Sequence, residues 1–229
     1  MIVICYGMQK SASTFTFQIA QDIAQTISDQ IQLSSTLPEK LQHPYVGEGF
    51  DDALRTIIAL IPDNEIYIIK THHPLTEYVK SLLVENQIKA IVSYRDPYDI
   101  VVSLKEAGEK ERLAGEKIQR FAQIETYNRA LNEVLAIIEI AEPWLKSPAT
   151  FKVPFPKITK ETVNVARDMA TYLQIPNTNV TEIVELYLSG QKPIWEFNVG
   201  LEGRGHQELK LSDDNKVKKE MDRFICLYL

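Results

Sequence analysis

Three short segments of this 229-residue chain carry the residue types that could do chemistry. They are the stretch 9–15, which contains Lys10, the stretch 70–73, which reads Lys-Thr-His-His, and the stretch that begins at Arg95. The first follows an apolar run and precedes an amphipathic pattern, so it predicts a strand–turn–helix junction. Backbone N–H groups and the positive end of a helix meet at such a junction and hold anions, phosphate above all. We therefore expect a site for a phosphorylated nucleotide.

The elements that must position these segments alternate between strands and helices. Apolar, β-branched runs at 2–6, 65–70 and 89–94 are typical of strands covered on both faces. Helical patterns lie at 15–28, 51–60 and 76–85, and Asp96-Pro97 opens another that ends near Ala107. This alternation predicts an α/β fold, a three-layer sandwich with a mainly parallel central sheet.

A cation follows each of the three predicted strands. Lys10, Lys70 and Arg95 stand at or just after the carboxyl ends of these strands. Binding sites of open parallel sheets lie at that edge. We therefore expect the three side chains to surround one pocket.

The second half of the chain is predicted to be mostly helical, at 118–142, 159–173, 180–188 and 212–229, with a short strand at 150–153. The stretch 105–117 is charged and interrupted by Gly108 and Gly115, which fits a surface helix or a mobile flap, the helix being the commoner case. Because the chain has no internal repeat and no clear linker, we expect one domain over residues 1–229.

Composition limits the partners and the compartment. The net charge of −6 and the pI near 5.3 argue against nucleic acid and anionic membranes as partners. An anionic ligand must then be held by a local positive pocket. Two isolated cysteines, Cys5 and Cys226, give neither a disulfide framework nor metal-ligand spacing, so a cytoplasmic location is expected. We expect no membrane span and no signal peptide.

The loop differs from the nucleoside-triphosphatase pattern G-x-x-x-x-G-K-[ST]. When the two are aligned on Gly7 and Thr14, Ala12 replaces the second glycine, Ser13 replaces the lysine, and Lys10 comes three residues early. The second strand ends in Lys-Thr-His-His and supplies no acidic Mg²⁺ ligand. The pattern favours a site without metal, neutralised by lysine, arginine and histidine. The alternative is an ordinary strand–helix junction with an incidental lysine.

The three segments together resemble the sulfotransferases that use 3′-phosphoadenosine 5′-phosphosulfate (PAPS) and release adenosine 3′,5′-bisphosphate (PAP). The family loop P-K-S-G-T-T-W corresponds here to Gln9-Lys10-Ser11-Ala12-Ser13-Thr14-Phe15. Lys10, Ser11 and Thr14 match, whereas Gln9 and Ala12 depart. Ala12 would restrict the backbone if a positive φ is required.

The other two motifs occur in the family's order. Lys70-Thr71-His72-His73-Pro74 is similar to K-T-H-x-P, and the stretch from Arg95 to Ser103 is similar to R-[ND]-P-x-D-x-x-x-S. The resemblance covers residues 1–105 well and the remainder loosely. It implies the fold of the P-loop-like sulfotransferases.

The resemblance implies a role for each matched residue. Lys10 would contact the 5′-phosphate and the bridging oxygen, and Lys70 would steady the sulfuryl oxygens. Arg95 and Ser103 would hold the 3′-phosphate. The remaining donor contacts would come from the loop and from a later glycine-containing segment, at Ser11, Ala12, Ser13, Thr14, Phe15, Arg204 and Gly205.

His72 would be the general base, since a neutral imidazole can accept the acceptor's proton at neutral pH. The adjacent His73 should face the other way and be structural. Other interpretations stay open: Lys70 as a plain strand-end lysine, Arg95 as the partner of Asp96 or Asp99, and Arg204 in an exposed turn.

The sequence thus predicts sulfuryl transfer from PAPS to a hydroxyl or amine of a small-molecule or carbohydrate acceptor, without a metal. The alternatives are a P-loop small-molecule kinase and a non-catalytic nucleotide-binding protein. Residues 36–52 and 105–120, with Tyr45 and Phe50, are candidates for the acceptor pocket. The sequence does not indicate the acceptor's identity or the oligomeric state.

Overall fold

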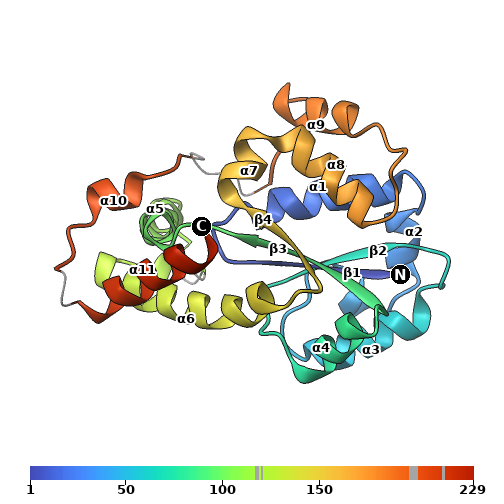
Figure 1. Cartoon of the computed structure of the whole chain (residues 1–229), viewed down its shortest axis with the longest axis horizontal. Coiled ribbons are helices and arrows are strands. Elements are labelled where there is room, and N and C mark those ends of the chain that lie inside the picture. The colour runs from blue at the N-terminus through green and yellow to red at the C-terminus, as the bar shows by residue number, and fades with distance from the viewer. Residues whose placement is uncertain (117–118, 120, 196–200, 213–214) are drawn as a thin grey trace.

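A parallel four-stranded sheet forms the centre of the computed structural model, with helices on both faces (Figure 1). The strand order is β2-β1-β3-β4, from β1 (Ile2–Gly7), β2 (Tyr67–Thr71), β3 (Ile88–Tyr94) and β4 (Thr150–Pro154). The structure describes residues 1–116, 119, 121–195, 201–212 and 215–229. The predicted α/β class and all four predicted strands are confirmed.

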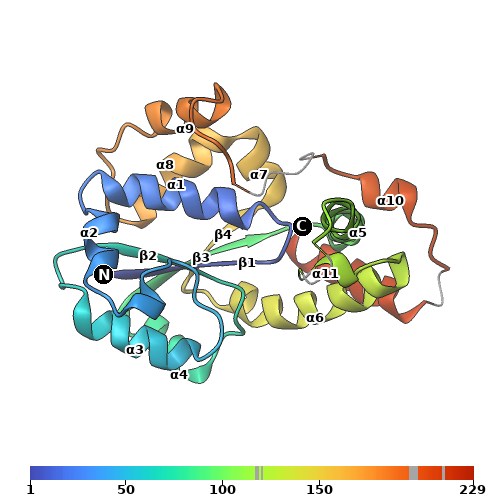
Figure 2. The ribbon, with the colours of Figure 1, turned by 180° about the vertical axis from the view of Figure 1, so that it is seen from behind.

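The helices form one layer on each side of the sheet, as the front and back views show (Figures 1 and 2). One layer contains α1 (Ser13–Gln25), α7 (Phe155–Lys160), α8 (Thr162–Tyr172) and α9 (Val180–Leu188). α2 (Gln30–Ser35) lies beside β2 at the edge of the sheet, and its Leu33 packs in the core of the opposite layer. The other contains α3 (Phe50–Leu60), α4 (Glu77–Val84), α6 (Tyr127–Lys146) and α11 (Lys216–Tyr228). α5 (Pro97–Leu113) and the short α10 (Arg204–Glu208) lie beyond the carboxyl edge of the sheet.

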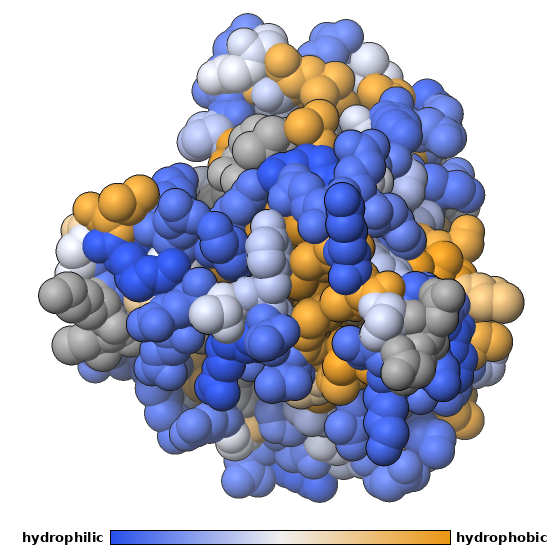
Figure 3. All heavy atoms as spheres, turned by 90° about the vertical axis from the view of Figure 1, so that its left-hand side faces the viewer, coloured by the Kyte–Doolittle hydropathy of each residue, from blue (hydrophilic) through white to orange (hydrophobic). Residues whose placement is uncertain are grey.

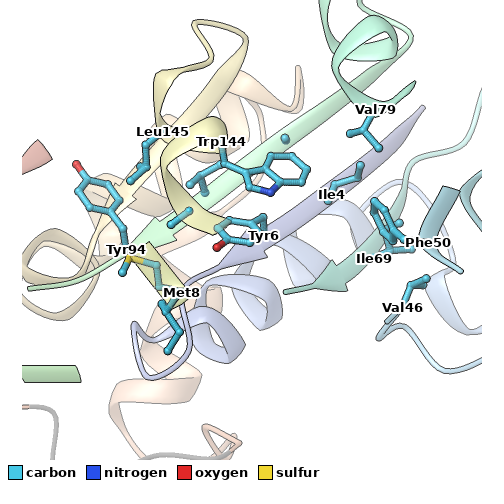
Figure 4. Packing of buried hydrophobic residues seen from close by; sticks show 14 of the residues in the cluster. Ile4, Tyr6, Met8, Val46, Phe50, Ile69, Val79, Tyr94, Trp144 and Leu145 are labelled. Carbon is cyan, nitrogen blue, oxygen red and sulfur yellow. The ribbon is translucent and has the colours of Figure 1, made fainter. Parts of the chain in front are cut away.

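Successive residues of β1 point into two separate cores, because side chains alternate along a strand. Ile4 and Tyr6 pack in the core under α3, α4 and α6, whereas Val3 and Cys5 pack in the core under α1 and α8. The Tyr6 ring stacks on the indole of Trp144, with 5.0 Å between centroids and 12° between planes, as the close-up of this core shows (Figure 4). Burial on both faces explains the continuous apolar runs of these strands.

The register brings three strand ends together. Tyr6 of β1 pairs with Thr71 of β2, and Gly7 pairs with Ser93 of β3. A short segment also pairs with the outer edge of β2: the Lys70 N–H donates to the Pro44 carbonyl, and the Val46 N–H donates to the Lys70 carbonyl, both at 2.8 Å. Residues 44–46 are therefore fixed beside the end of β2.

Some predicted helix boundaries are wrong. The helix expected to end near Ala107 continues to Leu113 through Gly108. A Cβ at Gly108 would lie 2.3 Å from the Phe121 carbonyl oxygen, so the glycine allows the following segment to pack on α5. The charged stretch therefore begins as a helix, the commoner of the two expected cases, while its last residue, 117, lies outside the described part of the chain.

The remaining helices differ mainly in their ends. The helix expected at 118–142 is α6, which starts at Tyr127 and continues past Pro143, and the pattern at 159–173 divides at Glu161 into α7 and α8. The helix expected from 212 begins at Lys216, and residues 213–214 lie outside the described ranges. A search of the described helices found none with the length and apolar character needed to cross a bilayer.

Candidate active site

One cavity lies at the carboxyl edge of the sheet, with a volume of about 1070 Å³. Lys10, Lys70, His72, Arg95 and Ser103 all line it, so the three predicted strand ends do meet at one pocket. In the space-filling view toward this edge, hydrophobic residues lie in the middle of the face with hydrophilic residues around them (Figure 3). Phe121, Phe155 and Trp195 also line the cavity, which therefore combines a cationic end with apolar surface.

The loop between β1 and α1 has a strained backbone. Lys10 and Ala12 adopt left-handed φ values of 64° and 61°, although neither is glycine. A non-glycine residue in this region costs about 1–2 kcal/mol. Ala12 is the N-cap of α1, and its methyl side chain cannot accept a hydrogen bond from the first N–H groups of the helix, as a serine or aspartate at this position would. An anion at this helix end would be stabilised by those N–H groups.

The Ser11 hydroxyl is not on the described cavity wall, and its predicted contact with the phosphate remains a prediction. It is buried inside the loop, where it donates to the Met8 carbonyl at 2.6 Å and also lies 3.2 Å from both oxygens of Ser93. Its N–H donates to the same Met8 carbonyl at 3.3 Å. Ser11 therefore holds the loop against β3, while Ser13 and Thr14 line the cavity.

The two lysines lie on different parts of the cavity wall. Lys70 Nζ donates to the Thr14 hydroxyl at 2.5 Å, which links the end of β2 to the first turn of α1. Lys10 Nζ lies 5.0 Å from the centroid of the Phe121 ring, within range of a cation–π contact. Both ammonium groups thus contact neighbours from other segments.

His72 is held in a defined tautomer. Its Nδ1 lies 2.6 Å from the Gly7 carbonyl oxygen, and a carbonyl can only accept a hydrogen bond. Nδ1 therefore carries the proton of the neutral ring, and Nε2 carries the lone pair. The Tyr45 ring lies 5.8 Å from this imidazole, centroid to centroid.

His73 faces a different environment, as the alternation of an extended segment predicts. Its ring stacks on Phe50 at 5.2 Å, and its carbonyl accepts a hydrogen bond from Trp144 Nε1 at 3.1 Å. Phe50 itself is 1% exposed and belongs to the core. The expectation that Phe50 contacts the acceptor is therefore wrong, because α3 turns this side chain away from the cavity.

Arg95 is almost fully buried, with 7% of its surface exposed. Nη1 donates to the Lys10 carbonyl at 3.2 Å, Nη2 lies 3.5 Å from Asp99 Oδ2 and also donates to the Leu201 carbonyl, and the guanidinium stacks on Phe155. Burial lowers the pKa of Arg95, and Asp99 opposes that shift. Nε is buried and finds no hydrogen-bond partner in the described chain, so Arg95 pairs with Asp99 and keeps a donor unsatisfied.

Arg204 and Gly205 are not among the residues that line the described cavity, and their predicted phosphate contact remains a prediction. The Arg204 guanidinium pairs with Glu106 and, at 3.0 Å, with Glu208, which raises its pKa. The Gly205 N–H donates to Asp99 Oδ1 at 2.9 Å, and a Cβ there would lie 2.1 Å from the Tyr98 backbone. These residues fix their segment against the start of α5.

Several residues of the wall come from the second half of the chain and have no site role in the sequence prediction. Phe155 follows β4, Tyr187 lies in the last turn of α9, and Trp195 lies in the segment after that helix. The Tyr187 hydroxyl donates to Asp22 at 2.7 Å, and the Trp195 N–H donates to Gln18 on α1 at 3.0 Å. Only the position of Phe155 at a strand end could have indicated a site residue.

Among the residues that are described, no three His, Cys, Asp or Glu side chains gather as a metal ion would require. The charged groups around the loop are instead the lysines and Arg95.

Comparison with known proteins gave one family and a set of similar folds. The family model described as "Sulfotransferase domain" matches residues 2–189. Retinol dehydratase in complex with androsterone and the inactive cofactor PAP aligns with a TM-score of 0.62 at 14% identity, over 98% of this chain and 79% of that one. Mouse sulfotransferase SULT7A1 complexed with PAP aligns with a TM-score of 0.58 at 14% identity, over 99% and 83%. No curated protein sequence matches.

Proposed function

This chain belongs to the sulfotransferase-domain family, and we propose that it transfers a sulfuryl group from PAPS to a hydroxyl or amine of a small-molecule or carbohydrate acceptor, with His72 as general base. One observation carries the proposal. Two lysines, a buried arginine and an oriented imidazole, delivered by three strand ends, line a single cavity. The structures of retinol dehydratase and of mouse SULT7A1 with PAP support PAPS as the donor.

The residues at the cationic end fit a nucleotide with two phosphate groups. The left-handed loop at the start of α1 suits the 5′-phosphate, with Lys10, Ser13 and Thr14 as its contacts. Arg95 and Ser103 suit the 3′-phosphate, because the unsatisfied Nε of Arg95 is a buried donor that needs an acceptor.

Transfer needs one new bond, one broken bond and one proton transfer. The acceptor oxygen or nitrogen attacks sulfur, a new bond to sulfur forms, and the bond between sulfur and the bridging oxygen breaks. The acceptor proton moves to His72 Nε2, and the Gly7 carbonyl, which accepts from Nδ1, stabilises the resulting imidazolium. Lys10 neutralises the charge that develops on the departing PAP, and Lys70 the charge on the sulfuryl oxygens.

We also propose that residues 1–229 act as one domain in the cytoplasm. The two cysteines support a reducing compartment, since Cys5 is buried in β1 and Cys226 is exposed on α11. Neither pairs with the other in a disulfide.

Titration calorimetry tests the donor assignment. PAP should bind tightly without Mg²⁺, ATP should bind weakly, and labelled PAPS should be consumed when a panel of acceptors is added. Tight binding of ATP that requires Mg²⁺ would instead support the kinase. PAP binding without turnover of any acceptor would favour the non-catalytic nucleotide-binding protein.

A further inference from the structure

The wall that α5 contributes to the cavity changes character along the helix. Ser103, Glu106, Ala107, Lys110, Glu111 and Ala114 line the cavity, at the spacing of one helical face. At a rise of 1.5 Å per residue, Glu111 lies about 12 Å along the helix axis from Ser103. The proposed donor contact at Ser103 is thus separated from an acidic position two turns further on.

Glu111 is the exceptional carboxylate of this face. Glu106 pairs with Arg204, whereas Glu111 Oε2 is buried and accepts no hydrogen bond from any part of the chain that the structure describes. The neighbouring Arg112 donates to the carbonyls of Ala122 and Ile124 instead, at 2.7 and 3.1 Å. A buried carboxylate oxygen without a donor is unfavourable, so the site favours a ligand that supplies one.

The wall near the base is aromatic. Pro44, Tyr45 and His43 also line the cavity, and the pairing of residues 44–46 with Lys70 fixes this segment beside His72. His43 Nδ1 accepts from the Tyr45 N–H at 3.1 Å, so Nε2 carries the proton of the neutral His43 ring. The cavity thus offers an aromatic face near the base and a carboxylate elsewhere on its wall.

From this arrangement we infer that the acceptor carries a cationic amino group in addition to its nucleophile, and that Glu111 binds that group. This inference rests on the proposed function. An ammonium group gives Glu111 a charge-assisted hydrogen bond, the strongest kind that a carboxylate forms with a small ligand. The chain's net charge of −6 also favours the approach of a cationic acceptor.

Two pairs of acceptors test the inference with the wild-type enzyme. Tyramine is compared with tyrosol, in which a hydroxyl replaces the amine, and glucosamine with N-acetylglucosamine. We expect kcat/KM at least tenfold higher for the ammonium-bearing member of any pair that is sulfated. Preference for the neutral member, or PAP binding without sulfation of either ammonium-bearing probe, overturns the inference.

Substitution of Glu111 tests the residue. Glu111→Gln should lower kcat/KM about tenfold for the ammonium-bearing probe, change the neutral partner less than twofold, and leave PAP affinity and Tm unchanged. Glu109→Gln is the matched control, because Glu109 is exposed and pairs with Lys105 at 2.8 Å. An equal loss for both acceptors in Glu111→Gln would show a structural role instead and overturn the assignment.

A charge-reversing variant of Glu111 tests the same assignment by an expected gain of activity, which damage to the fold cannot produce. Glu111→Lys should favour the anionic 3-(4-hydroxyphenyl)propionate over tyramine, and an unchanged preference in folded protein contradicts the inference. Failure of PAP to bind the wild type would contradict the proposed function. PAP binding with equal use of tyramine and tyrosol would contradict the acceptor inference alone.

Discussion

The end of β1 and the loop that follows it differ in how well their side chains and backbone are satisfied. At Tyr6 the strand packs against Trp144, which is fully buried and donates its indole N–H to a backbone carbonyl. A few residues later, Lys10 and Ala12 adopt left-handed conformations beside Arg95, whose buried Nε lacks a partner in the described chain. The indole of Trp144 is thus satisfied within the core, whereas the loop keeps two strained residues beside an unsatisfied donor.

This difference shows how the site is supported. Strained residues persist where the surrounding structure determines their conformation, and such residues concentrate at functional sites. The carbonyl that accepts from Trp144 belongs to His73, next to the proposed base. The core thus fixes the backbone at His72 while the loop presents cations to the cavity.

The largest expected effect is a loss of activity without a loss of stability, in a variant of His72. Replacement of His72 by alanine should lower kcat by about 10²–10⁴-fold, because the acceptor loses its general base. Tm and PAP affinity should change little, since the ring's hydrogen bond to Gly7 lies at the cavity wall. Steady-state kinetics with labelled PAPS, calorimetry and thermal melts measure the three quantities. Full activity in this variant would refute the assignment of the base.

The two tryptophans provide the second test, this time of the core. Trp144→Ala should lower the free energy of unfolding by about 3–5 kcal/mol, since it removes a fully buried aromatic side chain. The matched variant is Trp195→Ala, because Trp195 lines the cavity and is 51% exposed. Urea denaturation compares them. Equal destabilisation by both would contradict the division between a supporting core and a binding wall.

The same contrast explains what the sequence could predict. The strands and α9 have strong local patterns, and the predicted helix 180–188 coincides with α9. The convergence of Lys10, Lys70 and Arg95 followed from a general property of parallel sheets, and the cavity confirms it. Residue type and order along the chain were sufficient for these conclusions.

The sequence could not indicate the surroundings of a side chain whose partner comes from a distant segment. Ser11 faces Ser93, Arg204 pairs with Glu106, and Phe50 turns into the core. No local pattern distinguishes these fates from contact with a phosphate or an acceptor. The continuation of α6 past Pro143 is a similar case, because tertiary packing overrides the local preference of proline.

A third, smaller effect concerns the contact between α6 and α11, whose contribution to the free energy of unfolding should depend on pH. Glu142 on α6 accepts from Lys146 at 2.7 Å and from Arg223 on α11. Burial alone would raise the pKa of Glu142, but the hydrogen bonds from these two side chains outweigh it and lower the pKa below the ordinary 4.5. A carboxyl whose folded-state pKa is lowered stabilises the fold above its unfolded pKa, and this contribution is lost as the pH falls through the folded value.

Glu142→Gln should therefore lower the free energy of unfolding by about 1 kcal/mol at pH 7, since Arg223 and Lys146 are partly exposed. The difference from wild type should shrink as the pH falls below about 4.5. Thermal melts from pH 7 to pH 3 measure it. A difference that stays constant over this range would mean that the charge of Glu142 does not stabilise the contact between α6 and α11.

The smallest effect has an unusual sign and tests the strain in the loop. Glycine in place of alanine normally destabilises a helix by about 1 kcal/mol, which is expected for Ala136→Gly at an exposed position within α6. At Ala12, with φ of 61°, glycine removes the left-handed penalty of about 1–2 kcal/mol, which exceeds its entropic cost of about 0.5–1 kcal/mol. Ala12→Gly should thus stabilise the protein by about 0.5–1 kcal/mol. If urea denaturation shows that both variants destabilise alike, the loop stores no strain, and the contrast with the core then rests on charge alone.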